Sequence, residues 1–334
     1  NHALSALRAN VRLAPTRDLR RIPPATATGY RPPMALDSFL LIGLLIAAGV
    51  LCARIRLLPD NSAEVLNQFA LNVCLPAAVL RFASQLQFDA SLLGLMAVPW
   101  ALLLLSIVLV WLAGRVINLR ADEKAVLLLC IPLGNTSFLG YPLTEAFLGT
   151  EALPYAVAYD QFGSFLILSS WGLWVLARYG GDAPPTLRDI GRRVLRFPPF
   201  IALILALTVM PAEPHPAIER LLARLSDALL PIVTLAIGLQ LRFRVPARER
   251  GPLAFGLAAK LLVLPAAAWL LTGLIGMESL MRQATVLESA MAPMITASAL
   301  AISHRLAPGL AAALVGFGIP ISLLTLLGWR WWLV

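Results

Sequence analysis

The stretch GNTSFLGYPL at residues 134–143 interrupts an apolar segment with two glycines and a proline, and Pro132 stands just before it. A second stretch, AMAPMIT at residues 290–296, places Pro293 inside another apolar segment. Proline removes a backbone donor and clashes with the preceding helical turn, so each segment is predicted to be a helix that breaks near its middle. In lipid, the backbone groups that such a break frees need other partners.

The composition places these segments in a membrane. Of the 334 residues, 59% are hydrophobic and only 13% are charged, and the mean hydropathy is +0.79. A soluble domain is typically about 45–50% apolar and about 25% charged. A water-soluble, disordered or disulfide-stapled chain is therefore excluded, and the chain is predicted to be an all-α integral membrane protein.

Ten apolar segments qualify, or nearly qualify, as membrane-spanning helices, which need about 20 residues each. They cover about residues 37–54, 62–83, 90–113, 123–148, 152–177, 197–211, 217–241, 252–275, 280–303 and 309–333. A polar stretch separates the first five from the last five. We therefore divide the chain into a first five-helix half at residues 34–179, a cytoplasmic linker at 180–196 and a second half at 197–334.

Lysine and arginine near the segment ends set the orientation, because cytoplasmic loops carry an excess of them. One side of the membrane has fifteen: Arg54, Arg56, Arg115, Arg120, Lys124, Arg178, Arg188, Arg192, Arg193, Arg196, Arg242, Arg244, Arg248, Arg250 and Arg305. The other side has five: Arg81, Arg220, Arg224, Arg282 and Arg330. The richer side is predicted to be cytoplasmic, so both ends of the ten-helix body face outside.

Residues 1–33 carry six arginines and one acid, Asp18, without the apolar core of a signal peptide. Met34 is a plausible first residue of the native chain, so we expect residues 1–33 to be a disordered or mis-assigned extension. An organelle transit peptide is the alternative. The net charge of +9 comes mostly from this tail and from the orientation signal, so it does not indicate a nucleic-acid partner.

The two halves enter the membrane from opposite sides, which is the arrangement of an inverted repeat. A gapless comparison supports a repeat, because residues 64–76 match residues 219–231 at Glu, Leu and Pro positions, and Gln85 matches Gln240. The broken helices occupy matching positions, the fourth and the ninth. Such a pair indicates a transporter site whose half-helix N-termini favour an anion, and two ordinary proline kinks are the alternative.

GNTSFLGYPL resembles the signature of the auxin efflux carrier family, and residues 287–293 (LESAMAP) and 158–160 (AYD) are also similar to family members. The resemblance covers about residues 35–334. It implies ten helices in two inverted five-helix repeats, with crossover helices 4 and 9, a scaffold domain, a transport domain and an elevator-like mechanism. The short linker resembles that of the prokaryotic members called malonate permeases rather than the plant PIN exporters. It implies a multi-pass protein of the bacterial inner (plasma) membrane.

The resemblance also implies that the two crossovers line the substrate pocket. The candidate substrate-binding residues are Asn135, Gly134, Thr136, Pro142, Pro293 and Met294. Ionisable groups at membrane depth are costly, so polar residues within the helices are candidates for ion or proton coupling. These are Asp160, Gln161, Lys260 and Glu288, of which Lys260 is also a candidate for binding an organic anion. Structural pairs are the alternative, either Lys260 with a carboxylate or Arg224 with Asp227.

We expect a secondary carrier for a small organic anion, a carboxylate such as malonate or an auxin-like acid. Coupling to a proton or sodium gradient is left open, and a homodimer through the scaffold helices is a further expectation. A sodium-coupled symporter of the bile-acid type, a channel and a membrane-embedded enzyme are the alternatives. The sequence has no nucleotide fingerprint, zinc motif or nucleophile elbow, so we expect no enzyme activity, cofactor or metal.

Overall fold

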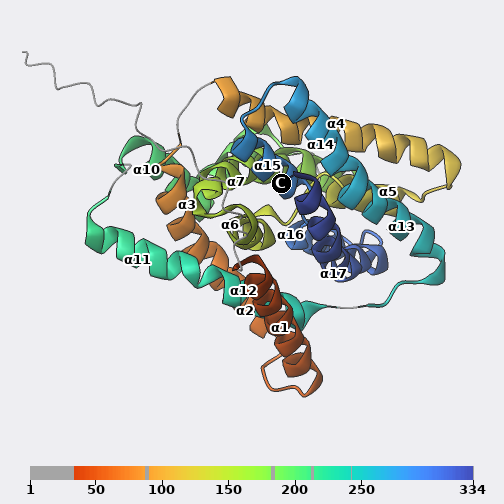
Figure 1. Ribbon diagram of the computed structural model, residues 1–334. Coiled ribbons are helices and arrows are strands. Elements are labelled where there is room, and N and C mark those ends of the chain that lie inside the picture. The colour runs from red at the N-terminus through yellow and green to blue at the C-terminus, as the bar shows by residue number, and fades with distance from the viewer. Residues whose placement is uncertain (1–33, 87–89, 182–184, 212–213, 242, 334) are drawn as a thin grey trace, which may run out of the picture. The chain divides into compact units, whose positions relative to one another are not determined.

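The computed structural model describes residues 34–86, 90–181, 185–211, 214–241 and 243–333. Within these ranges the chain is helical and contains no β-strand, which confirms the predicted helical class (Figure 1). The predictions made for residues 1–33 lie outside the described residues.

The first half of the described chain contains eight α-helices. They are α1 (Met34–Arg54), α2 (Ser62–Phe69), α3 (Leu75–Ala83), α4 (Ala90–Val116), α5 (Ala121–Cys130), α6 (Tyr141–Leu148), α7 (Leu153–Tyr159) and α8 (Leu173–Gly180). Wider π-helical turns lie between α2 and α3 (Ala70–Cys74), before α6 (Thr136–Gly140), and between α7 and α8 (Asp160–Phe165 and Leu168–Gly172). A single 3₁₀ turn, Thr150–Ala152, leads into α7.

The predicted linker contains α9 (Leu187–Arg196). The helices that follow are α10 (Pro198–Thr208), α11 (Pro216–Asp227), α12 (Leu229–Gln240), α13 (Arg250–Ala258), α14 (Leu264–Leu274), α15 (Ser279–Ser289), α16 (Ile295–Ser303) and α17 (Pro308–Leu333). A 3₁₀ turn, Ala247–Glu249, precedes α13, and a π-helical turn, Ala259–Val263, joins α13 to α14.

Five helical stretches in the described ranges are long and apolar enough to cross a bilayer. They are Ser62–Ala83, Ala90–Val116, Pro216–Gln240, Ala247–Leu274 and Pro308–Trp332, and shorter apolar helices cover Leu40–Arg54 and Pro198–Thr208. These stretches agree with a multi-pass membrane protein, although they are fewer than the ten segments predicted. The fourth and ninth segments differ because each consists of two shorter helices, α5 with α6 and α15 with α16.

Buried apolar side chains form two clusters, and residues around each of the two interruptions contribute to both clusters. The first cluster includes Leu133, at the end of the α5 segment, whereas the second includes Phe138, at the start of the α6 segment. At the second interruption the two clusters interleave, because Val286 and Met294 belong to the first cluster whereas Leu287 and Met291 belong to the second. Each interruption therefore lies at the boundary between two packed bodies of helices.

Helix α1 packs closely on α12 although the two are far apart in the sequence (Figure 1). The crossing is made by Gly49 and Gly238, because a Cβ added at Gly49 would lie 2.8 Å from the Cα of Gly238. Small residues let helix backbones approach in this way, which gives van der Waals contact where lipid removes the hydrophobic driving force.

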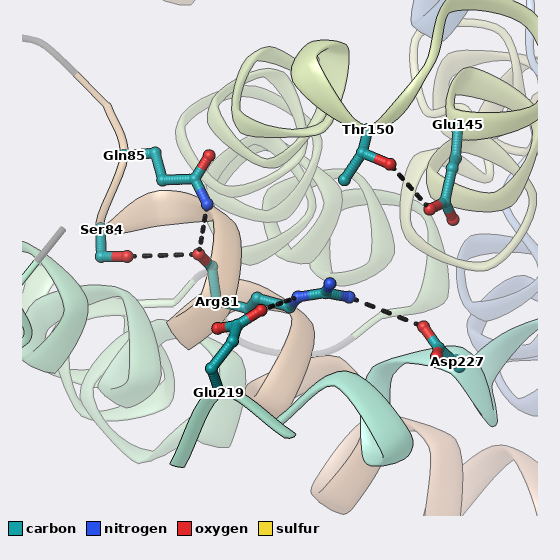
Figure 2. A network of polar contacts seen from close by, with 7 residues as sticks. All are labelled: Arg81, Ser84, Gln85, Glu145, Thr150, Glu219 and Asp227. Atoms are coloured by element: carbon teal, nitrogen blue, oxygen red, sulfur yellow. Dashed lines mark hydrogen bonds and ion pairs between the residues drawn. The ribbon is translucent and has the colours of Figure 1, made fainter. Parts of the chain in front are cut away.

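An ion-pair network ties α3 to α11 (Figure 2). Arg81 Nε donates to Glu219 Oε1 at 2.7 Å, and Arg81 Nη1 lies 3.6 Å from Asp227 Oδ1. Asp227 thus pairs with Arg81, and the predicted Arg224–Asp227 pair is wrong for the described residues. Both acids are more than a third exposed, so the network contributes modestly to stability and chiefly fixes how the two helices pair.

We expect Gly49→Val to lower the free energy of unfolding by about 1–3 kcal/mol, because its side chain would overlap main-chain atoms of α12. Thermal unfolding in detergent, followed by tryptophan fluorescence, measures the effect. Gly43→Val is the matched control on the same helix, since no atom lies within 4 Å of a Cβ added there. Equal unfolding midpoints for the two variants would contradict the close crossing.

Candidate functional site

Two helices are interrupted at matching places. Helix α5 ends at Cys130 and helical geometry resumes at Thr136, whereas α15 ends at Ser289 and α16 begins at Ile295. Each gap contains one proline, Pro132 in the first and Pro293 in the second. The missing proline donor and the steric clash of its ring account for the loss of helix at both places.

The two gaps hydrogen-bond to each other through their main chains. Gly134 and Pro293 form an isolated antiparallel bridge. The Asn135 amide donates to the Ala292 carbonyl at 2.8 Å, and the Met294 amide donates to the Leu133 carbonyl at 2.9 Å. Each gap thereby supplies partners for polar groups that the other gap leaves without a helical bond, as a non-helical segment at membrane depth requires. We call residues 133–135 and 292–294 the main-chain bridge.

Two helical segments begin directly after the bridge, one at Thr136 and the other at Ile295. Helix N-termini carry unpaired amides and the positive end of the helix dipole. Because both N-termini start at the same place, their fields add there and favour a negatively charged group.

Asn135 carries an unused donor at this point. Its side chain is 3% exposed, and Nδ2 has no hydrogen-bond partner among the described residues. Its main-chain oxygen is engaged, because it accepts from the amides of Leu139 and Gly140 at 3.1 Å each. A buried amide donor without a partner is costly, so the Asn135 side chain is suited to a ligand atom.

Asp160 is buried and its carboxylate is fully occupied. It accepts hydrogen bonds from Thr136 Oγ1, Ser137 Oγ (2.7 Å), Tyr141 Oη (3.0 Å) and Gln161 Nε2 (2.8 Å). Three of these donors lie on the segment that follows the first gap. Asp160 therefore holds the start of that segment against α7, which is a positioning role rather than an open binding role.

Glu288 is also buried but is only partly satisfied. Its Oε1 accepts from Thr144 Oγ1 at 2.9 Å, whereas Oε2 has no hydrogen-bond partner among the described residues. Gly140 makes room for this carboxylate, because a Cβ added there would lie 2.8 Å from Glu288 Cδ. The free oxygen leaves Glu288 able to accept a proton or to bind a cation.

Lys260 brings a positive charge to the bridge. It is 1% exposed, and Nζ donates to the Ser289 carbonyl, the last of α15, at 3.2 Å. A Cβ added at Gly134 would lie 3.1 Å from this nitrogen, so the ammonium lies beside Gly134. Within the described chain Lys260 has no carboxylate oxygen within 4.0 Å, so a direct ion pair is absent there and the predicted structural pair stays a prediction.

The structure gathers most of the predicted site residues around the bridge. Gly134, Asn135, Pro293 and Met294 belong to it, and Thr136, Asp160, Gln161, Lys260 and Glu288 surround it through the contacts above. Gln161 Oε1 is a further buried oxygen without a partner among the described residues. Pro142 differs, because it lies in the first turn of α6 and takes no part in the bridge.

Ser137, Tyr141 and Thr144 were not predicted as site residues, although they donate hydrogen bonds to the two carboxylates. One signal was present. Thr136, Gly140 and Thr144 recur every four residues, so they lie along one face of a helix. That face presents two hydroxyls with a small residue between them, and Asp160 and Glu288 lie against it.

The described chain contains a cavity of about 740 Å³. The residues that line it come from the α1–α2 connection, α12, α16 and α17, and Ile295 joins it to the end of the bridge. Most of the lining is apolar, and Arg56 and Asp60 are its charged residues. In the sequence Arg56 indicates only the orientation, because tertiary packing decides which helices surround the loop that carries it.

Comparison with known proteins identifies the family of the chain. A family model described as membrane transport protein matches residues 35–183 and 185–330. An uncharacterized transporter of Methanocaldococcus jannaschii is 27% identical over 309 residues, which cover 89% of this chain and 98% of the relative. An uncharacterized transporter of Methanothermobacter thermautotrophicus is 27% identical over 298 residues, covering 88% and 96%. The resemblance seen in residues 134–143 is thereby confirmed.

We expect Asp160→Asn to lower the free energy of unfolding by about 2 kcal/mol or more, because hydrogen bonds to a charged group are worth about 1.5–3 kcal/mol each. An amide keeps one acceptor oxygen and turns a donor toward the hydroxyls. Thermal unfolding of the purified protein measures the loss. Asp60→Asn, which changes an exposed carboxylate in the same way, is the control, and an equal midpoint for both variants would contradict the positioning role of Asp160.

Proposed function

Since the chain belongs to the membrane transport protein family, we propose that it is a secondary active carrier for a small organic anion. Its family and relatives make it a membrane transporter and not an enzyme. The observation that carries the anion proposal is the unpartnered Nδ2 of Asn135, the residue that follows Gly134, beside which the Lys260 ammonium lies.

The anion would bind where three sources of positive potential meet. The first is the Lys260 ammonium, and the others are the N-termini that begin at Thr136 and Ile295. Asn135 Nδ2 would donate a hydrogen bond to the anion and so recover the cost of its burial. A carboxylate such as malonate or an auxin-like acid fits this set of donors.

The proposed architecture is ten spans in two inverted five-helix repeats, residues 34–179 and 197–334, joined by the linker at 180–196. The matched interruptions support it, because two segments related by a two-fold axis in the membrane meet as an antiparallel pair. The orientation indicated by lysine and arginine places both ends of the body outside an inner (plasma) membrane.

The proposed mechanism is elevator-like alternating access. One body, with α1, α3, α10 and α12, would be the scaffold, and the body with α4, α8, α13 and α14 would move. The cavity supports this mechanism, since it leads from the α1–α2 connection to Ile295 beside the bridge. On the proposed orientation, that connection is cytoplasmic and the cavity is the inward-facing path.

Coupling to a cation is proposed at Glu288 rather than at Asp160. Glu288 Oε2 is free, whereas the Asp160 carboxylate already accepts four hydrogen bonds. A proton or a sodium ion at Glu288 would offset the cost of its buried charge. The sodium-coupled alternative is distinguished by uptake that depends on a sodium gradient and is lost in Glu288→Gln.

We expect Asn135→Ala to abolish uptake while leaving the protein folded, because it removes the free donor and breaks no side-chain hydrogen bond among the described residues. A thermal-shift screen of mono- and dicarboxylates on the purified protein first identifies the substrate, and uptake into proteoliposomes then measures transport. Asn72→Ala is the control, since the Asn72 side chain bonds within its own helix, to the Gln68 carbonyl. Normal uptake by a well-folded Asn135→Ala protein would overturn the assignment.

We expect Lys260→Gln to raise the KM for the anion by about tenfold or more, which is the effect of losing one charge-assisted contact. Initial uptake rates over a range of substrate concentrations measure it, and Lys124→Gln, at a helix end, is the control. An unchanged KM in a folded Lys260→Gln protein would show that the ammonium does not contact the substrate.

A further inference from the structure

Helix α9 in the linker has two distinct faces. Its residues Leu187, Ile190, Val194 and Leu195 follow one side of the helix, and the opposite side carries Arg188, Arg192, Arg193 and Arg196. No residue of α9 is fully buried, and Leu187 and Leu195 are 89% and 61% exposed. Such a helix has a large apolar surface that the rest of the described chain does not cover.

The length and packing of the next helix, α10, indicate the depth of α9 in the bilayer. Helix α10 has 11 residues, about 16 Å, which is too short for a hydrocarbon core of about 30 Å. It packs on α3, the second half of the span Ser62–Ala83. Helix α3 is the half of this span that lies farther from the α1–α2 connection. Because α10 packs on that half, it crosses only the part of the bilayer away from this connection.

Contacts with the preceding helical run, from α7 to α8, indicate the same depth for α9. Phe197, at the junction of α9 and α10, stacks on Phe165 with ring centroids 4.0 Å apart. Phe165 lies near the middle of the helical run from α7 to α8, and α9 itself contacts the turn Leu168–Gly172 farther along that run. Helix α9 therefore lies beside the near part of the bilayer and not in free water.

The arginines of α9 have little compensation from the protein. Within the described ranges none of the four forms an ion pair within 4.0 Å. The acid of α9, Asp189, caps the helix instead, since its Oδ2 accepts from the Thr186 hydroxyl at 2.6 Å and from the Thr186 amide at 3.1 Å. These hydrogen bonds hold the pKa of Asp189 below its usual value.

We propose that α9 is an interfacial helix that binds anionic phospholipid headgroups of the surrounding bilayer. Its four guanidinium groups match headgroup phosphates, which arginine binds through paired hydrogen bonds. Leu187 and Leu195 enter the acyl boundary, as the apolar face of an interfacial helix does. This inference depends only on membrane insertion and holds whatever the substrate is.

Lipid binding here would fix the depth of the junction between the two halves. Helix α10 belongs to the body proposed as the scaffold, and α9 contacts the span that precedes the linker. An attachment of α9 to the headgroups would hold α10 at one level in the bilayer, although α10 alone is too short to do so.

Hydrogen–deuterium exchange on the full-length protein tests the proposal. The protein is placed in nanodiscs of phosphatidylcholine alone or of phosphatidylcholine with phosphatidylglycerol, and exchange is read from peptides that cover residues 187–196. We expect slower exchange with phosphatidylglycerol, and loss of that difference in high salt. In Arg188→Gln/Arg192→Gln the lipid-dependent slowing should fall by roughly tenfold or more, at about 1 kcal/mol for each arginine near an anionic surface.

Arg244→Gln/Arg248→Gln is the matched control, because it removes the same charge from two exposed arginines of the same predicted side, outside α9. We expect it to keep the lipid-dependent slowing at residues 187–196. Equal exchange in the two lipid compositions would overturn the proposal. So would slow exchange that appears only when a soluble acidic protein is added, since that result would make a protein the partner of α9.

Discussion

The main-chain bridge between residues 133–135 and 292–294 is the constraint on which the rest of the structure depends. A polar backbone group without a partner costs several kcal/mol in lipid, so a helix can break at membrane depth only where another segment supplies the missing bonds. Here each interruption supplies the other. The bridge therefore brings distant parts of the chain together, sets two helix N-termini side by side, and gathers the buried polar residues around one point.

The two buried carboxylates near the bridge show how environment separates roles. Asp160 accepts four hydrogen bonds and fixes the segment after the first gap. Glu288 accepts one and keeps a free oxygen, and Gly140 leaves the space that its carboxylate occupies. Lys260 lies beside Gly134 of the bridge, and its ammonium donates to the Ser289 carbonyl at the end of α15. A carrier needs such a mixture, because fixed groups position a site whereas unsatisfied ones can bind and release a ligand.

Prediction from the sequence succeeded where the cause is local. Pro132 and Pro293 predict interruptions because proline disrupts helix wherever it stands, and the scarcity of charge predicts a membrane class. Prediction failed for Asp227, which was paired with Arg224 on its own helix but contacts Arg81 on another. Pro142 is a similar case: it belongs to the motif at residues 134–143, but it lies in the first turn of α6 and takes no part in the bridge. Pairing across helices depends on helix rotation, which hydrophobic patterns of all-apolar helices do not define.

The sequence by itself determined the membrane class, the helical segments, the two interruptions, the family, and the residues that carry charge into the apolar interior. The tertiary structure alone decided how those residues are used. It joined the two interruptions, filled the hydrogen-bonding capacity of Asp160, and left Asn135 Nδ2 and Glu288 Oε2 without partners among the described residues. The physical reason is that composition and proline act within a few residues, whereas satisfaction of a buried polar group depends on atoms from other helices.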